Sequence, residues 1–165
     1  MTSLPAFNTA SDQEALDLVL SCAAVPRWAQ AVVAARPYPE VAAVLDSARH
    51  LADPWTEEEV DGALADHPRI GEPAGSGSRG AHHSSQEQSG VDPDDDGVGQ
   101  RLREGNRAYE ERFGHVFLVR AAGRSAEEIL AALEERLTHD PQTERRTAAE
   151  QLREIAVLRL QGELS

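Results

Sequence analysis

A chain of 165 residues is long enough to form one domain with a substantial hydrophobic core. Its formal net charge of −13, from 29 acidic against 16 basic residues, opposes binding to nucleic acids or anionic membranes, because both partners require a basic surface. The lone cysteine, Cys22, excludes an internal disulfide, and no segment approaches the roughly 18 apolar residues of a membrane span, so we expect a cytoplasmic protein.

The N-terminal third of the chain carries three signals for helix starts. Ser11 and Glu14 match a capping box, in which a hydroxyl accepts from a backbone amide and the acidic side chain three residues later reaches back. Pro26 and Pro39 are each followed by apolar residues at helical spacing, and the first helical turn tolerates proline. The sequence therefore predicts helices that begin near Ser11, Pro26 and Pro39, the latter two extending to about residues 35 and 51.

The middle of the chain predicts a helix, a loop and a second, polar helix. Thr56 and Glu59 form another capping box, and the helix that they begin must stop near His67, because Pro68 restricts the preceding residue to extended geometry. Glycines and serines between about residues 71 and 83 predict a flexible loop without a phosphate-binding pattern. Residues from about 94 to 112 predict a polar helix with an acidic first turn.

The C-terminal third predicts two more helices. Ser125 and Glu128 form the third capping box, and an apolar face repeats at helical spacing from about Pro141 to Gln161. The apolar run Val116–Val119 is too short and isolated to found a sheet, which favours a buried turn or a helix start. We therefore predict an all-α fold, a single compact bundle of about seven or eight helices in one domain covering residues 1–165.

Two segments carry residues suited to acid–base chemistry. His67 would project from the rigid break before Pro68, at a helix end that favours the protonated ring. A histidine there can be a helix cap or a catalytic group, and the residues alone leave this choice open. Ser84 and Glu87 follow the glycine-rich loop, where a carboxylate near free backbone amides can hold polar substrate atoms; taken alone, this pair fits another capping box better.

Other polar residues allow alternative functions. His67, His82 and His83 could bind a metal in a helical hydrolase, but adjacent histidines seldom point at one ion, so exposed loop histidines are favoured. Arg159 lies in the apolar face of the last helix, where its side chain can extend to solvent or reach into a pocket. A non-catalytic helical interaction module would use His67 and Glu87 only as caps.

Short motifs along almost the whole chain resemble the OHCU (2-oxo-4-hydroxy-4-carboxy-5-ureidoimidazoline) decarboxylase family. The most specific part is the pair His67-Pro68-Arg69-Ile70-Gly71 and Ser84-x-x-Glu87-Gln88 at this separation. The other motifs are Phe7-Asn8, Ser21-Cys22, Pro26-Arg27-Trp28, Arg36-Pro37-Tyr38, Asn106-x-x-Tyr109-x-x-Arg112-Phe113-Gly114, Phe117 to Ala121, and Leu158-Arg159-Leu160.

The resemblance implies a function and a set of site residues. It implies decarboxylation of OHCU to (S)-allantoin and CO2 in urate breakdown, by an all-α homodimer that needs neither cofactor nor metal and whose partner is a small ureide. His67 and Glu87 would be the catalytic residues. The substrate contacts would come from Pro68, Ser84, Gln88, Phe117, Leu118, Val119, Arg120, Ala121 and Arg159.

The chemistry of this substrate is consistent with a cofactor-free reaction. The carbon that bears the carboxylate and the hydroxyl adjoins a ring C=N bond, which can accept the electron pair when CO2 leaves. We expect His67 to orient or deprotonate the hydroxyl and to assist proton return, as an imidazole can near neutral pH. Glu87 would hydrogen-bond the ureido and ring N–H groups, and Arg159 would bind a carbonyl or carboxylate oxygen.

Overall fold

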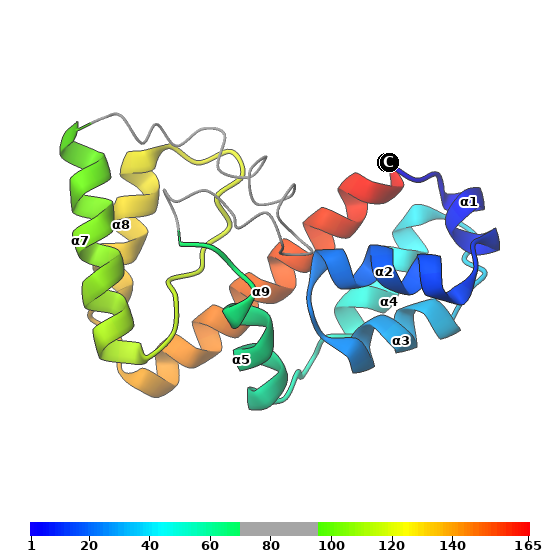
Figure 1. Cartoon of the computed structure of the whole chain (residues 1–165), viewed down its shortest axis with the longest axis horizontal. Helices are drawn as coiled ribbons and strands as arrows, with labels where there is room; N and C mark the ends of the chain where they lie inside the picture. Colours follow the sequence, from blue (N-terminus) through cyan, green and yellow to red (C-terminus); the bar gives the residue numbers. More distant parts are fainter. Residues whose placement is uncertain (70–95) are drawn as a thin grey trace. The chain divides into compact units, whose positions relative to one another are not determined.

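The computed structural model of the chain describes residues 1–69 and 96–165, and all regular structure within these two ranges is α-helical (Figure 1). The predicted all-α fold of about seven or eight helices is confirmed. The eight helices in the described ranges are α1 (Leu4–Thr9), α2 (Asp12–Cys22), α3 (Pro26–Ala34), α4 (Val41–Leu51), α5 (Glu57–Ala65), α7 (Asp96–Phe113), α8 (Ala126–Arg136) and α9 (Pro141–Leu164). Among them, no helix has the long apolar stretch that crossing a membrane requires.

The chain divides into two compact units. Unit 1 comprises Met1–Ala63 and Arg153–Ser165, and unit 2 comprises Leu64–Leu152. The expectation of one domain covering residues 1–165 stays a prediction, and each unit is described by itself.

The core of unit 1 is centred on a buried tryptophan. Trp28 on α3 is fully buried, its Nε1 donates to the Ala48 carbonyl of α4 at 2.9 Å, and its ring meets Trp55 edge-on with centroids 5.5 Å apart. Helix α3 packs against both α2 and α4 (Figure 1). Further buried side chains of this core include Phe7, Val19, Val25, Val32, Val44 and Leu160.

Local signals set the starts of α2 and α3 as predicted. The Glu14 amide donates to Ser11 Oγ at 3.2 Å, and the Ser11 amide donates to Glu14 Oε2 at 3.0 Å, which completes the capping box. Helix α3 begins at Pro26, after Val25 in an extended conformation. Both starts therefore depend only on residues close in sequence.

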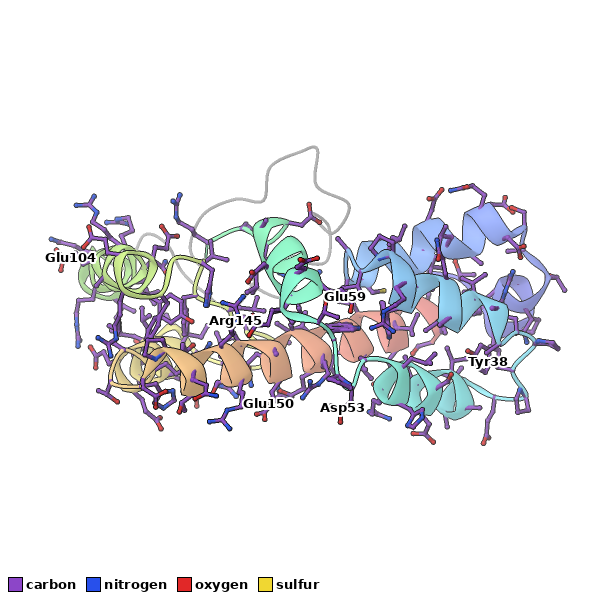
Figure 2. The ribbon with its side chains drawn as sticks, turned by 90° about the horizontal axis from the view of Figure 1, so that it is seen from below. Tyr38, Asp53, Glu59, Glu104, Arg145 and Glu150 are labelled. Atoms are coloured by element: carbon purple, nitrogen blue, oxygen red, sulfur yellow. The ribbon has the colours of Figure 1, made fainter. Side chains whose placement is uncertain are left out.

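The helix start predicted at Pro39 is two residues too early. Hydrogen bonds from α1 keep the residues before α4 in a non-helical conformation. Asn8 Nδ2 donates to the Tyr38 carbonyl and the Tyr38 amide donates to Asn8 Oδ1, both at 2.9 Å. The Tyr38 side chain, labelled in Figure 2, is buried, and its hydroxyl donates to the Val32 carbonyl at 2.8 Å. Glu40 remains extended, so α4 begins at Val41.

Unit 2 contains the end of α5, then α7, α8 and the first half of α9. Helices α7 and α8 lie side by side (Figure 1). A Cβ atom on Gly105 of α7 would lie 2.5 Å from Leu133 Cδ2 of α8, so a larger residue at this position would displace the buried Leu133 side chain. The core between these elements includes Leu102, Tyr109, Phe117, Val119, Ile129 and Leu130.

The chain leaves α7 through a glycine and enters a segment without regular structure. Gly114 has a left-handed φ of 79°, and its amide donates to the Glu110 carbonyl at 2.9 Å, which ends the helix. The run Val116–Val119 is neither strand nor helix start, and its members Phe117 to Val119 are buried. The prediction that this run founds no sheet and is largely buried therefore holds, whereas neither the turn nor the helix start offered for it is present. Helix α9 begins at Pro141 as predicted and extends to Leu164.

Candidate functional site

His67 lies directly beyond the C-terminal end of α5. The helix ends at Ala65, and the His67 amide donates to the Leu64 carbonyl at 3.1 Å in the closing turn. His67 and Pro68 are both half-buried. The helix thus stops where Pro68 was predicted to stop it, and the imidazole is carried on a short turn whose backbone is hydrogen-bonded.

The chain just after His67 is tied to α7 by an ion pair. Arg69 Nε donates to Glu110 Oε1 at 2.6 Å, and Arg69 Nη2 donates to Glu110 Oε2 at 3.1 Å. Because the Arg69 side chain is about half exposed, the pair contributes only about 0–1 kcal/mol to stability. Its bidentate geometry connects the chain that follows His67 to α7. Sequence reasoning missed Glu110, since nothing near it in the chain marks it as the partner of Arg69.

The predicted substrate-contacting segment, residues 117–121, is almost entirely buried. Its buried members are Phe117, Leu118, Val119 and Ala121, and Arg120 is half-buried. Within the described ranges, the backbone amides of these four buried residues donate to no protein group. Buried amides require a hydrogen-bond partner, so this backbone is suited to holding the acceptor atoms of a polar ligand.

Two long side chains hold the backbone of this segment. Gln151 Oε1 on α9 accepts from the Arg120 amide at 2.9 Å. Arg136 Nη1, at the end of α8, donates to the Leu118 carbonyl. The guanidinium of Arg136 also lies over the Phe117 ring, with 4.7 Å from its central carbon to the ring centroid. The segment is therefore anchored from both α8 and α9.

Arg136 belongs to a buried polar cluster centred on Glu144, in the first turn of α9. Glu144 is fully buried and Arg136 is 5% exposed. Arg136 Nε donates to Glu144 Oε1 at 2.8 Å, and the hydroxyl of Tyr109 donates to the same oxygen. The ring Nδ1 of His139 lies 3.0 Å from Glu144 Oε2. Burial raises the pKa of the Tyr109 phenol, and the hydrogen bond to Glu144 raises it further, so the phenol stays protonated as a donor.

Sequence reasoning did not identify this cluster. Tyr109 was noted within a family motif, whereas Arg136 and Glu144 lie in charged helical stretches that are typical of solvated surfaces. Because a buried glutamate looks the same in sequence as an exposed one, no local signal could have found it.

Arg159 lies on α9 within unit 1. Its side chain is only 6% exposed, so it does not extend into solvent, which excludes one of the two expected conformations. Its Nη1 lies 3.4 Å from the Cys22 carbonyl. The substrate contact predicted for Arg159 stays a prediction.

Several predicted residues lie outside the residues that the structure describes. They are Ser84, Glu87 and Gln88 of the second motif, His82 and His83 of the alternative metal site, and the loop at about 71–83. Elsewhere in the chain, within residues 1–69 and 96–165, no three His, Cys, Asp or Glu side chains gather as metal ligands. The pairing of His67 with Glu87 therefore stays a prediction.

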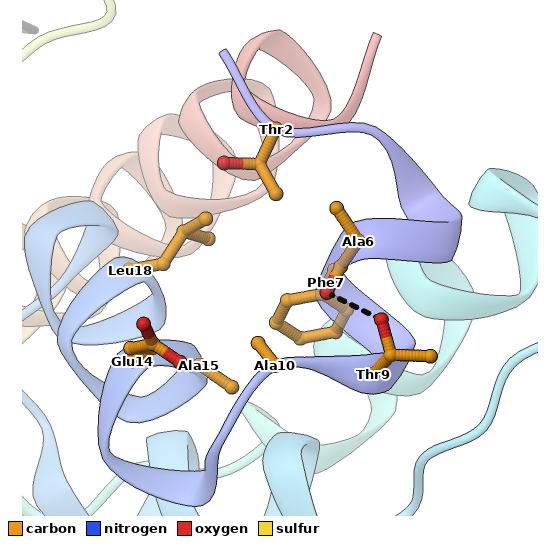
Figure 3. A pocket seen from close by; sticks show the side chains of 8 residues that line it. All are labelled: Thr2, Ala6, Phe7, Thr9, Ala10, Glu14, Ala15 and Leu18. Carbon is orange, nitrogen blue, oxygen red and sulfur yellow. Dashed lines mark hydrogen bonds between the residues drawn. The ribbon is translucent and has the colours of Figure 1, made fainter.

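A hollow of about 360 Å³ between α1 and α2 of unit 1 contains none of the predicted site residues (Figure 3). Thr9 Oγ1 donates to the Pro5 carbonyl at 2.9 Å, and the Glu14 carboxylate accepts from Ser11. With these polar groups already bonded and Phe7 and Leu18 in its wall, the hollow offers no set of catalytic groups. The candidate site is instead formed by His67-Pro68 and residues 117–121 of unit 2.

These features define an all-α protein whose candidate site combines an imidazole at a helix end with a buried run of backbone amides. Comparison with known proteins gives the family: OHCU decarboxylase matches residues 8–161, and the chain belongs to this family. This match favours the decarboxylase interpretation over the metal-dependent hydrolase and the interaction module.

Curated relatives and a solved structure agree with this assignment. The chain is 29% identical over 136 residues to the OHCU decarboxylase of Haloferax volcanii, a match that covers 82% of this chain and 79% of that protein. It is 42% identical over 76 residues to the OHCU decarboxylase of Amia calva, covering 46% of this chain and 43% of that protein. A crystal structure of OHCU decarboxylase in the presence of (S)-allantoin shares the fold, with a TM-score of 0.72 at 24% identity over 88% of this chain and 96% of that one.

Proposed function

We propose that this chain is a carboxy-lyase that decarboxylates OHCU to (S)-allantoin and CO2 in urate breakdown. The observation that carries the proposal is the family match over residues 8–161, which includes His67 and the 117–121 segment. The half-buried imidazole beside Pro68 and the buried amides of that segment supply an acid–base group and hydrogen-bond donors.

In the proposed reaction the substrate is its own electron sink. The C–C bond to the carboxylate breaks, CO2 leaves, and the electron pair moves into the adjoining ring C=N bond to give an enol. The ring nitrogen takes up a proton, and the enol hydroxyl gives up its proton to become the new ring carbonyl. One proton is delivered to one face of the adjacent carbon, which bears the ureido group, and this sets the S configuration. His67 orients or deprotonates the substrate hydroxyl and assists this proton return, a role suited to an imidazole near neutral pH.

The other proposed contacts hold the substrate in place. Glu87 accepts from the ureido and ring N–H groups, with Ser84 and Gln88 beside it, and Pro68 lines the site. The backbone of residues 117–121 donates to substrate oxygens, and Arg159 binds a carbonyl or carboxylate oxygen with its fork of donors. A homodimeric state and a cytoplasmic location, expected from the family resemblance and the lone cysteine, are part of the same proposal.

Circular dichroism of freshly generated substrate tests the proposal. Urate is converted with uricase and a hydrolase to OHCU, and the optical signal of (S)-allantoin is followed with and without this protein. We expect the chiral signal to appear faster with the protein than without it. A heat-inactivated sample should give no signal above that of the spontaneous reaction. An unchanged rate at micromolar protein would refute the proposed activity.

A further inference from the structure

The buried cluster around Glu144 is costly for a protein to maintain. Removing a carboxylate and a guanidinium from water has a large desolvation cost, and apolar side chains of equal volume often stabilise a fold as well or better. Glu144 is nevertheless fully buried, with Tyr109, Arg136 and His139 all directed at its two oxygens. Such a cluster is better explained by a geometric role than by stability alone.

The contacts of Arg136 indicate what that role is. Its planar guanidinium group donates in two directions. Nε and Nη2 donate to the Glu144 carboxylate, whereas Nη1 donates to the Leu118 carbonyl. Because the carboxylate fixes the plane of the guanidinium, it also fixes the direction of the Nη1–H group. The stacking of the same guanidinium over Phe117 adds a second point of attachment to the segment.

The segment that Arg136 holds is the one with unused amides. The Leu118 carbonyl is bound by Arg136, while the amides of Leu118 and Val119 donate to no group within the described residues. A peptide plane that is held at its carbonyl side presents its amide in a defined direction. The Leu118 carbonyl shares its peptide plane with the Val119 amide, so Glu144 acts on the orientation of the Val119 amide through Arg136.

We propose that Glu144 is a positioning residue that, through Arg136, sets the orientation of the substrate-binding backbone at residues 117–121. The inference rests on the proposed function, which assigns substrate contacts to this backbone. Glu144 and Arg136 do not touch the substrate. Their contribution is to keep the donors of the segment arranged before the substrate arrives, which is the general advantage of a preorganised site.

Two variants and one control test this proposal. Arg136→Lys keeps a positive charge beside Glu144 but cannot reach both Glu144 and the Leu118 carbonyl, and Glu144→Gln removes the charge that orients Arg136. The control is Glu134→Gln, the same change at a carboxylate of α8 that accepts from Arg101 Nη2 at 2.6 Å on the surface. All three are compared with the wild-type chain.

The first measurement needs no substrate. In wild type and Glu134→Gln, backbone ¹⁵N order parameters of residues 117–121 should be near the rigid value of about 0.85, and in Arg136→Lys they should fall toward about 0.6. Order parameters that stay at the wild-type value in Arg136→Lys would overturn the anchoring. If Glu144→Gln does not fold, Arg136→Lys still decides the question.

The second measurement separates positioning from stability. Loss of preorganised binding should raise the KM for OHCU about tenfold in Arg136→Lys and Glu144→Gln, with kcat changed less than about threefold. A purely structural role would lower the amount of active enzyme and hence the apparent kcat while leaving KM at the wild-type value, and that result contradicts the proposal. If the wild type does not turn over OHCU, the proposed function fails, whereas the order parameters still test the anchoring.

Discussion

At the scale of single residues, the position of His67 follows from its neighbours on both sides. Pro68 prevents the helix from continuing, the His67 amide closes the last turn on Leu64, and Arg69 binds Glu110. The imidazole therefore lies between a backbone hydrogen bond to α5 and an ion pair to α7, although its own sequence context resembles an ordinary helix end. Such restriction is what a general acid–base group requires, because proton transfer is efficient only over hydrogen-bond distances.

Replacement of His67 tests its role directly. In His67→Asn, a polar side chain of similar reach is kept but the titrating imidazole is lost, so we expect the rate of (S)-allantoin formation to fall at least about 100-fold. The fold should be retained, because the side chain is only half-buried at a helix end. Circular dichroism at allantoin wavelengths measures the first effect, and thermal unfolding followed in the far ultraviolet measures the second.

The matched control for this variant is His50→Asn, since His50 is an exposed histidine in the last turn of α4. Its activity should stay within about twofold of wild type. Near-normal turnover by His67→Asn would remove His67 from the mechanism.

Other motif residues of the family have structural roles that the sequence did not reveal. Arg36 Nη1 donates to the carbonyls of Phe7 and Ala10, at 2.7 and 3.0 Å, and so satisfies the C-terminal end of α1. Asn8 pairs with the backbone of Tyr38. These partners are about 30 positions apart, so the motifs could be recognised in the sequence but their contacts could not be predicted from it.

At the scale of elements, the helix starts that were predicted correctly are those set by hydrogen bonds between residues close in sequence. The boxes at Ser11, Thr56 and Ser125 all form, and at α8 the Glu128 amide donates to Ser125 Oγ at 3.2 Å. The start near Pro39 was misplaced because the bonds that decide it come from Asn8. The helix α1 was not predicted, since six residues around the buried Phe7 are too few to show a periodic pattern.

The hydrogen bond between Tyr109 of α7 and Glu144 of α9 makes the free energy of unfolding depend on pH in the alkaline range. The Tyr109 hydroxyl on α7 donates to Glu144 on α9, and burial is the main cause of its raised pKa. Below its ordinary value of 10.0 the phenol is protonated in both folded and unfolded chains. Above it, only the unfolded chain ionises, so the free energy of unfolding falls as pH rises toward the higher folded pKa.

Tyr109→Phe should flatten this alkaline loss of stability. From about pH 10 to about pH 11.5, Tyr109 accounts for up to about 1.4 kcal/mol per pH unit of the fall, which the variant lacks. The chain has no lysine, so few other groups titrate in this window. Urea unfolding at several pH values measures the slope; equal slopes in wild type and variant would contradict the assignment of the effect to Tyr109.

At the scale of the whole molecule, the net charge predicts that nucleic acids and anionic membranes are not partners, which stays a prediction, and it gives no positive information about the site. A charge of −13 disfavours an anionic substrate at long range, and every one of the 16 basic residues is an arginine. Arg136 and Arg159 are both buried, and an arginine in that setting presents fixed donors that the overall charge does not reveal. Which arginines are buried depends on tertiary packing, so the sequence could not single out Arg136, and the substrate contact of Arg159 stays a prediction from the family motif.

The absence of a cofactor from the proposed reaction is a prediction about the whole protein. Because the ring C=N bond of OHCU accepts the electron pair, no metal is required as an electron sink, and catalysis should survive complete metal removal. The protein is treated with a strong chelator and dialysed before the assay, so that uricase and hydrolase never meet the chelator. We expect a rate within about twofold of the untreated protein, together with far less than one metal ion per chain by elemental analysis. A loss of activity that zinc restores would instead support a site formed by His67, His82 and His83, and His82→Asn would then abolish the restoration.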